Sequence, residues 1–128
     1  MVKTHQRNNP TTMIKRIIDR GRSFVPAWNG LRLLATTETN FRVHLVAVIV
    51  VVTAGIFAAL SWQKWMALIA CMVTVLIAEA LNTAIEKICD LVHPGHHPMV
   101  KQIKDISAAA VLIAAIASAI TGVLVFLL

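Results

Sequence analysis

The sequence predicts an all-α integral membrane protein with three transmembrane helices in each subunit. The chain has 128 residues, of which 58% are hydrophobic and only 14% are charged. An ordinary soluble domain is about 45–50% apolar and about 25% charged, and a chain this short cannot bury so much additional apolar surface in a core of its own. The apolar residues also gather in three long runs. These observations exclude a soluble globule and a disordered protein.

Each of the three runs is long enough to cross a bilayer as a helix, which takes about 20 apolar residues. The runs cover residues 43–60, 65–85 and 106–128, and only the second contains an acid, Glu79. A lone strand cannot pair its backbone groups in lipid, and a closed barrel needs a much longer chain. The runs are therefore predicted to be three membrane-spanning helices.

The residues before the first span are predicted to lie on the membrane surface. Residues 1–22 form a polar and basic segment in which isoleucines recur at helical spacing, and Ser23 can serve as the N-cap of a second amphipathic stretch. One face of that stretch carries Phe24, Trp28, Leu31 and Leu34. We expect an interfacial helix here, and we assign residues 23–128 to a single membrane domain.

The basic residues predict an orientation. Of the 12 Lys and Arg residues, eight precede the first span, three lie between the second and third spans, and only Lys64 lies between the first two. The positive-inside rule then places the N-terminus and the second connection in the cytoplasm, with the C-terminus outside. Because a membrane surface explains the net charge of +6, no nucleic-acid partner is expected.

A stripe of polar residues follows the cytoplasmic end of the second span. On a helix, Glu79 and Glu86 lie within about 20° of one another, Asp90 lies about 20° to the other side, and Asn82 shares the face. An ionisable group within a span is costly and by default indicates function. The alternative is an acid that pairs with a lysine to lock helix packing, but no span contains Lys or Arg. We therefore favour a functional stripe.

The residue types in this region fit phosphoryl transfer. Carboxylates suit Mg²⁺, which is often shared with phosphates, and Lys101 and Lys104 could hold phosphate just before the third span. Arg32, a candidate substrate-site residue, and Arg42 could also reach phosphates, although anionic head groups explain them equally well. A base, metal ligands and cations together indicate a phosphotransferase at a membrane surface. The chain has no P-loop and no protein-kinase signature.

Two other classes of function stay open at this point. A small proton-coupled transporter would also use a lone intramembrane glutamate such as Glu79. It would not need the cytosolic acids and lysine that follow, and three spans give no inverted pair of repeats. A non-catalytic assembly factor would explain a stripe of small residues on the third span but not the acidic stripe. That small-residue stripe comprises Ala110, Ala114, Ser118 and Gly122.

Three motifs resemble those of the bacterial integral-membrane diacylglycerol kinase and undecaprenol kinase family. They are E-T-N-F-R-V-H over residues 38–44, E-x-x-N-T-A-x-E-x-x-x-D over 79–90, and H-P-x-x-K-x-x-K-D over 97–105. The resemblance covers about residues 22–128 and is closer to the undecaprenol kinase branch. Family members usually have a glycine shortly after the K-D pair, whereas this chain has Ser107 followed by alanines.

The resemblance implies a homotrimer of three-span subunits in the bacterial inner membrane, with an amphipathic surface helix at the N-terminus. It implies transfer of the γ-phosphate of ATP to a lipid alcohol, with undecaprenol favoured over diacylglycerol and Mg²⁺ as the cofactor. By matching positions, Glu79 would be the general base, with Asn82 beside it in the site. Glu38 and Glu86 would hold Mg²⁺ and, through it, the nucleotide. Direct nucleotide binding would fall to Asp90, Lys104 and Asp105.

A cluster of histidines lies between the second and third spans. His93, His96 and His97 resemble a metal-binding tract but lack the spacing and helical support of a zinc site. We expect a constrained polar turn instead.

Overall fold

A computed structural model describes residues 24–128, so the predicted basic segment, residues 1–22, and the predicted N-cap Ser23 lie outside the described residues. The described chain divides into two units after Thr37. Its helices are α2 (Phe24–Thr37), α3 (Thr39–Phe57), α4 (Trp62–Val92) and α5 (Pro98–Leu127). Helix α2 belongs to the first unit, and the other three helices form the second.

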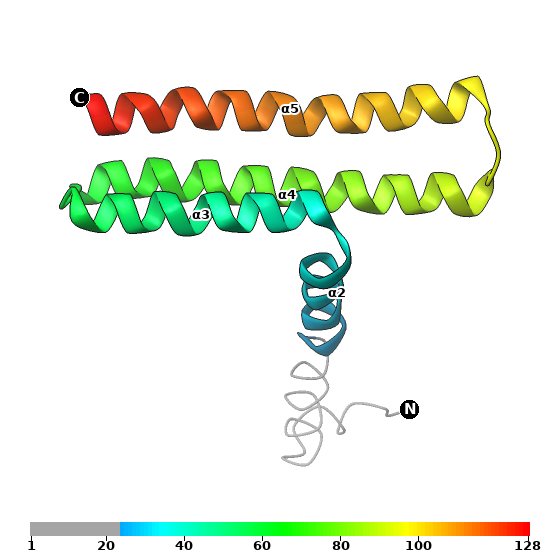
Figure 1. Cartoon of the computed structure of the whole chain (residues 1–128), viewed down its shortest axis with the longest axis horizontal. Helices are drawn as coiled ribbons and strands as arrows, with labels where there is room; N and C mark the ends of the chain where they lie inside the picture. Colours follow the sequence, from blue (N-terminus) through cyan, green and yellow to red (C-terminus); the bar gives the residue numbers. More distant parts are fainter. Residues whose placement is uncertain (1–23) are drawn as a thin grey trace, which may run out of the picture. The chain divides into compact units, whose positions relative to one another are not determined.

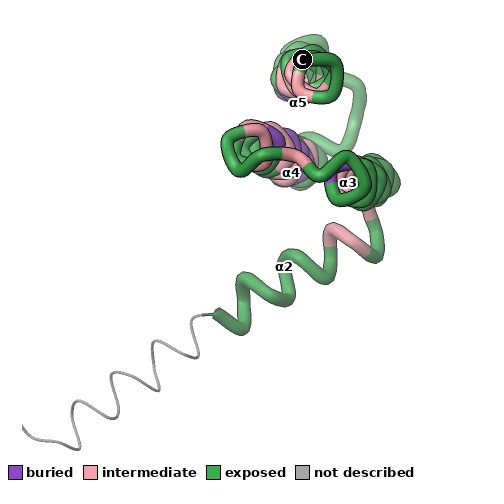
Figure 2. Tube along the Cα trace, turned by 90° about the vertical axis from the view of Figure 1, so that its left-hand side faces the viewer, coloured by how far each residue is buried: buried purple, intermediate pink, exposed green. Residues whose placement is uncertain are grey.

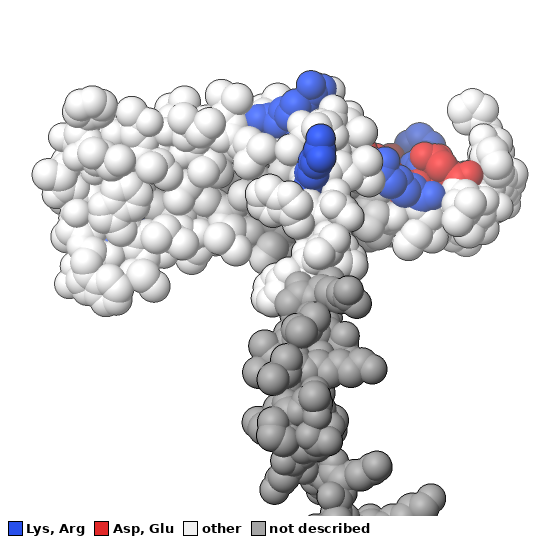
Figure 3. All heavy atoms as spheres, turned by 90° about the horizontal axis from the view of Figure 1, so that it is seen from below, with Lys and Arg blue, Asp and Glu red and all other residues white. Residues whose placement is uncertain are grey.

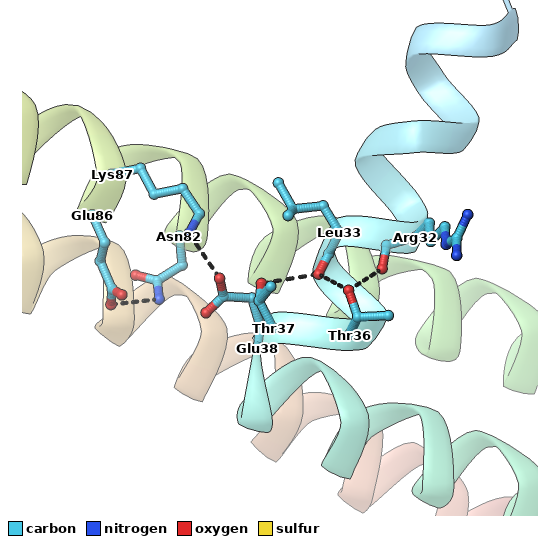
Figure 4. A network of polar contacts seen from close by, with 8 residues as sticks. All are labelled: Arg32, Leu33, Thr36, Thr37, Glu38, Asn82, Glu86 and Lys87. Carbon is cyan, nitrogen blue, oxygen red and sulfur yellow. Dashed lines mark hydrogen bonds and ion pairs between the residues drawn. The ribbon is translucent and has the colours of Figure 1, made fainter.

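Helix α2 covers the second amphipathic stretch predicted from the sequence. Its large apolar side chains are exposed, with Phe24 at 76% and Trp28 at 68%. Near its end, the hydroxyls of Thr36 and Thr37 donate to backbone carbonyls one turn earlier, at 2.8 and 2.9 Å (Figure 4). The hydroxyls at the end of this helix are therefore paired within the helix. Its apolar side chains are not covered by any other described residue of the same unit.

Helices α3, α4 and α5 are each long and apolar enough to cross a membrane, which confirms the predicted all-α class with three spans. Large apolar side chains are exposed on every one of them. Ile49 is 64% exposed, Ile77 is 54% exposed and Ile113 is 69% exposed. Such a surface suits contact with lipid rather than with water.

Two of the helices extend beyond the apolar runs that predicted them. Helix α4 continues to Val92 and α5 begins at Pro98, so both carry charged turns at the end where they are connected. A helix of 31 residues is about 46 Å long, compared with about 30 Å for the hydrocarbon core of a bilayer. The start of α5 has a local cause, because Pro98 occupies the first turn and Nδ1 of His97 accepts from the Met99 N–H at 3.2 Å.

Helix α4 is the centre of the second unit. It packs against both α3 and α5 (Figures 1 and 2). Most of the buried residues belong to it, as the purple segments of Figure 2 show. The apolar core is small, and its members are Phe41, Leu68, Val75, Cys89 and Val111. The remaining buried side chains are polar, and they mark the site described below.

The turn between α3 and α4 depends on a close approach. A Cβ added to Gly55 would lie 2.9 Å from the ring of Trp65, so only glycine leaves room for that indole. The turn then reverses through Ala59, which has a φ of 47°. Trp65 is thereby packed against the end of α3 and fixes the pairing of the first two spans.

Candidate functional site

Four polar side chains are buried together among apolar helices. Glu79 is 3% exposed, Asn82 and Thr83 are each 5% exposed, and Ser107 of α5 is 7% exposed. The first three lie on the face of α4 that the helical spacing predicted, and they face neighbouring helices rather than the surroundings. Burial of polar groups on this scale is unfavourable without partners, so the contacts of each one matter.

Glu79 is the deepest acid of the predicted stripe, and three other ionisable groups face it. Its carboxylate interacts electrostatically with His44 of α3, with Glu86 two turns further along α4, and with Glu38. The structure therefore brings together three of the acids that the sequence nominated. His44 was not predicted as a site residue, and it places a group that can carry positive charge on the helix opposite Glu79.

Asn82 connects two helices and an acid. Its Nδ2 donates to Oε1 of Glu86 at 2.9 Å (Figure 4), while its Oδ1 accepts from the Ser107 hydroxyl at 2.6 Å. The amide group thus bridges Glu86 on its own helix and Ser107 on α5. The sequence predicts Asn82 beside Glu79 but predicts no contact for it, and Ser107 stands out in the sequence only as a departure from a family pattern.

Glu38 stands at the N-cap of α3 and is paired across to α4. Its Oε1 lies 2.8 Å from Nζ of Lys87 (Figure 4). The Glu38 side chain is 24% exposed and that of Lys87 is 55% exposed, so the pair sits at the edge of the buried group. Lys87 was counted only for its charge in the sequence, although its position one residue after Glu86 puts it beside the site.

A second charged group lies further along, where α4 meets α5. Lys104 pairs with Asp90 across the two helices at 2.5 Å, and Lys101 pairs with Asp105 within α5. Lys104 also interacts electrostatically with Glu86, which links this group to the deeper one. On the face drawn in Figure 3, acidic side chains and lysines gather at this end while the opposite end is uncharged.

A groove of about 640 Å³ runs along this charged group. It is lined by Asp90, Lys101, Lys104 and Asp105 and by the connection between α4 and α5, including its histidines. Its size and the charged side chains in its lining suit a charged, water-soluble ligand. The sequence-predicted nucleotide residues Asp90, Lys104 and Asp105 therefore share one groove.

Two histidines of the connection, His93 and His97, accept hydrogen bonds from backbone groups. Nδ1 of His93 accepts from the Gly95 N–H at 3.4 Å, and Nδ1 of His97 accepts from Met99. The rings of His93 and His97 lie with their centroids 5.1 Å apart. These contacts are those of a constrained turn, in which two of the imidazole nitrogens are engaged by the backbone.

Arg32 lies on α2, in the first unit, and its side chain belongs to an exposed turn of that helix. The contacts described for the site all lie within the second unit, residues 38–128. Arg32 therefore stays a predicted substrate residue on the strength of its sequence position.

Glu38 and Glu86 suit a hard divalent cation that also binds waters and substrate phosphates. Within residues 24–128, no three Asp, Glu, His or Cys side chains converge into a preformed metal cage. Mg²⁺ does not need one, because it is usually held by one or two carboxylates together with waters and substrate phosphates. The carboxylates of Glu38 and Glu86 both interact electrostatically with Glu79 and are oxygen ligands of the type that Mg²⁺ prefers.

An apolar groove of about 620 Å³ lies among α3, α4 and α5. His44 lines it together with small and aliphatic side chains such as Val48, Val75 and Ala115. His44 also faces Glu79. One residue of the groove's lining, His44, is therefore also one of the groups that interact with the deepest acid.

Known proteins with similar sequences are lipid kinases. The sequence profile of the family described as prokaryotic diacylglycerol kinase matches residues 26–126. The chain is 41% identical over 106 residues to undecaprenol kinase of Bacillus subtilis, which covers 83% of this chain and 86% of that protein. It is 35% identical over 113 residues to diacylglycerol kinase of Escherichia coli K12, covering 88% of this chain and 90% of that one. A diacylglycerol kinase of Synechocystis is 41% identical over 103 residues, but this chain spans only 58% of its length.

Proposed function

We propose, since this chain belongs to the prokaryotic diacylglycerol kinase family, that it transfers the γ-phosphate of ATP to the hydroxyl group of a lipid alcohol. Its similarity to kinases of this family supports a membrane lipid kinase. Undecaprenol is the favoured acceptor and diacylglycerol the other candidate, because matches to both kinds of kinase cover most of the chain.

The observation that carries the proposal is the continuity of two polar groups along α4. The buried Glu79 and Asn82 and the half-buried Glu86 lead to the Asp90–Lys104 pair at the helix end. Phosphoryl transfer to a lipid needs a base where the lipid arrives and cations where the nucleotide arrives. A proton-coupled transporter would use Glu79 but leaves the outer charged group without a role, so we do not carry it further.

Glu79 is proposed as the general base. Its carboxylate takes the proton of the lipid hydroxyl while that oxygen forms a bond to the γ-phosphorus. The bond from the γ-phosphorus to the bridging oxygen of ATP breaks, and ADP leaves with the electron pair.

Glu38 and Glu86 are proposed to hold Mg²⁺, with Asn82 fixing Glu86 through its hydrogen bond. When bound, Mg²⁺ neutralises charge on the transferring phosphates. Asp90, Lys104 and Asp105 are proposed to bind the nucleotide in the groove between α4 and α5. Lys104 supplies a compact positive charge to phosphate oxygens, which requires its pair with Asp90 to open or to be shared.

The lipid is proposed to reach Glu79 from the bilayer. The apolar groove among the three spans is lined by His44, so a hydrocarbon chain lying in it would leave its hydroxyl beside Glu79. Arg32 is proposed to contact the head group of the substrate. The apolar surface of α2, at Phe24 and Trp28, supports a place for that helix in the membrane interface.

The remaining features of the proposal concern topology and assembly. The N-terminus and the α4–α5 connection are proposed to be cytoplasmic, with the C-terminus outside, in a bacterial inner membrane. Residues 1–22 are proposed to be a basic surface segment and residues 23–128 the kinase domain. Homotrimer formation is proposed from the family resemblance.

The experiment uses purified protein with [γ-³²P]ATP and Mg²⁺, presented separately with undecaprenol and with diacylglycerol in mixed micelles. We expect labelled phosphate in the extracted lipid, with undecaprenol the better acceptor by kcat/KM. Glu79→Gln serves as the matched inactive control. Absence of label from both lipids with folded protein would contradict the proposed function, and a preference for diacylglycerol would contradict the favoured acceptor.

A further inference from the structure

We propose that Ser107 is a positioning residue, whose hydroxyl fixes the side-chain amide of Asn82 so that the amide presents its N–H to Glu86. The inference rests on the proposed function, because it concerns how the site holds one of its carboxylates. Ser107 lies on α5, while Asn82 and Glu86 lie on α4.

The geometry is a hydrogen-bonded relay across two helices. The Ser107 hydroxyl donates to Oδ1 of Asn82 at 2.6 Å, and Nδ2 of Asn82 donates to Oε1 of Glu86 at 2.9 Å. Ser107 and Asn82 are both buried, at 7% and 5% exposure. Buried hydrogen bonds of this kind hold a side chain in place more strongly than exposed ones, because water does not compete for the groups.

The relay selects one of the two orientations of the amide. Turning the Asn82 amide over would place its oxygen against the carboxylate of Glu86, where two acceptors would face each other. The N–H groups would then point to Ser107, whose hydroxyl could no longer donate to Asn82. The Glu86 carboxylate therefore disfavours the turned amide, and the Ser107 hydroxyl, which would only accept from it, donates to Oδ1 in the orientation that gives Glu86 a donor.

Ser107 also has a local acceptor, the carbonyl oxygen of Lys104, at 2.9 Å. A hydroxyl has one hydrogen, and a serine within a helix commonly gives it to such a carbonyl. The contact to Asn82 is the shorter of the two, and within residues 38–128 no other donor reaches Oδ1 of Asn82. Because a buried amide oxygen without a donor is unfavourable, the bond from Ser107 to Asn82 is favoured over the bond from Ser107 to the Lys104 carbonyl.

Removal of the hydroxyl should release the amide without touching substrate. In Ser107→Ala, Oδ1 of Asn82 loses its donor and the amide samples both orientations, so Glu86 loses a fixed N–H. Loss of such an outer partner of a metal ligand typically costs about 10–100-fold in metal affinity or activity. We expect the lower end, about tenfold, because Ser107 acts through Asn82 and not directly.

The chain offers a matched control on the same pair of helices. Ser118 of α5 donates to the backbone carbonyl of Cys71 on α4 at 3.3 Å, so Ser118→Ala also removes a hydroxyl between α4 and α5 but leaves the amide relay intact. Because Ser118 also lines the apolar groove proposed for the lipid, this control is compared by Mn²⁺ binding and by the Asn82 signals, and not by lipid phosphorylation. Ser107→Thr keeps a hydroxyl at the site. Loss of function caused by packing alone would appear in both alanine variants.

Three measurements test the proposal on full-length protein. Binding of Mn²⁺, used as a probe for Mg²⁺, is measured by electron paramagnetic resonance without lipid or nucleotide. The side-chain amide of Asn82 is followed by ¹⁵N NMR and assigned with Asn82→Asp. Lipid phosphorylation gives the Mg²⁺ concentration for half-maximal rate and the KM for lipid.

We expect Ser107→Ala to shift the Asn82 amide signals and to raise the Mn²⁺ dissociation constant and the Mg²⁺ requirement about tenfold, with the KM for lipid unchanged. Ser107→Thr should resemble the wild type, and Ser118→Ala should keep the wild-type Mn²⁺ dissociation constant and Asn82 signals. Unchanged Asn82 signals in Ser107→Ala, or an equal effect of Ser118→Ala, would overturn the proposal. A wild-type protein that phosphorylates no lipid would contradict the proposed function instead, and the Asn82 signals would still decide the part of Ser107.

Discussion

Lys87 of α4 reaches across to α3, where its Nζ lies 2.8 Å from Oε1 of Glu38. Glu38 is also a proposed Mg²⁺ ligand, so a lysine and a divalent cation would share one carboxylate. The lysine side chain is 55% exposed and can leave the pair. We interpret Lys87 as the cation that neutralises Glu38 until the metal binds.

Replacement of Lys87 by glutamine should therefore tighten metal binding. Exposed ion pairs contribute about 0.2–1 kcal/mol, and release of Glu38 from such a pair corresponds to an increase in affinity of up to about fivefold. Titration with Mn²⁺ in the absence of nucleotide measures this effect. Lys101→Gln is the control, because Lys101 pairs with Asp105 and not with Glu38. Weaker Mn²⁺ binding by Lys87→Gln would show that Lys87 supports the metal site.

Lys104 is expected to contribute to ATP binding more than to stability. Its partner Asp90 has a side chain that is 65% exposed, so breaking the pair should leave the free energy of unfolding almost unchanged. A hydrogen bond to a charged group contributes about 1.5–3 kcal/mol, so Lys104→Ala should raise the KM for ATP about ten- to hundredfold.

The exchange of charges separates these two roles. Asp90→Lys combined with Lys104→Asp restores an ion pair between α4 and α5 but removes the lysine from its place in the groove. We expect the double variant to unfold like the wild type while its KM for ATP stays high. Recovery of the KM for ATP in the double variant would mean that the pair, and not Lys104 itself, is what the nucleotide requires.

The three spans could be predicted because each is an uninterrupted apolar run, but the ends of the helices could not be read from those runs. An apolar run reports the thickness of the bilayer core, whereas α4 and α5 continue through Asp90 and Lys104 for as long as their hydrogen bonds and caps allow. The signal for the start of α5 was present in the sequence as Pro98 preceded by His97, a proline at the first turn with a residue that can cap it.

The candidate site could also be predicted only in part. Helical periodicity placed Glu79, Asn82 and Glu86 on one face, because they belong to one helix. The contacts of Ser107 with Asn82 and of Lys87 with Glu38 join different helices. They depend on the register in which those helices pack, and spacing along the chain carries no information on that register.

Gly55 is expected to be essential for the packing of α3 against α4. In Gly55→Ala the added Cβ would lie 2.9 Å from the Trp65 ring, and overpacking of this kind costs about 1–3 kcal/mol. Gly30→Ala is the control, because nothing lies within 4 Å of a Cβ at that position, and alanine is favoured over glycine within a helix by roughly 0.5–1 kcal/mol. Unfolding in sodium dodecyl sulfate should show a lower midpoint for Gly55→Ala alone, and equal midpoints would contradict the close approach.

The proposed topology places the charged groove on the side of the membrane that holds ATP. With Cys71 and Cys89 replaced by alanine, a cysteine introduced at Gln63 should react with an impermeant maleimide added outside intact cells. One introduced at His96 should react only after the membrane is opened, because the α4–α5 connection lies on the side with most of the basic residues. The reverse pattern would separate the site from cytosolic ATP and contradict the kinase proposal.

Glu79 and Glu86 are seven residues apart on α4, which corresponds to about 10.5 Å along the axis, and this separation predicts different consequences for their substitution. Glu79 is the deeper and more buried acid, beside the groove from which the lipid is proposed to arrive. Glu79→Gln should therefore keep Mg–ATP binding and lose about 10²–10⁴ in kcat, the usual contribution of a general base.

Glu86→Gln and Glu38→Gln should instead weaken the Mg²⁺ dependence of nucleotide binding, with activity partly recovered at high metal concentration, because each removes one of two proposed carboxylate ligands. Calorimetry of Mg–ATP binding to each variant, together with lipid phosphorylation, separates the two kinds of defect. Thr74→Val is a suitable control, because the hydroxyl of Thr74 bonds only within α4, to the carbonyl of Ala70, away from the acids. Loss of Mg–ATP binding in Glu79→Gln with normal binding in Glu86→Gln would show that the roles of the two acids are reversed.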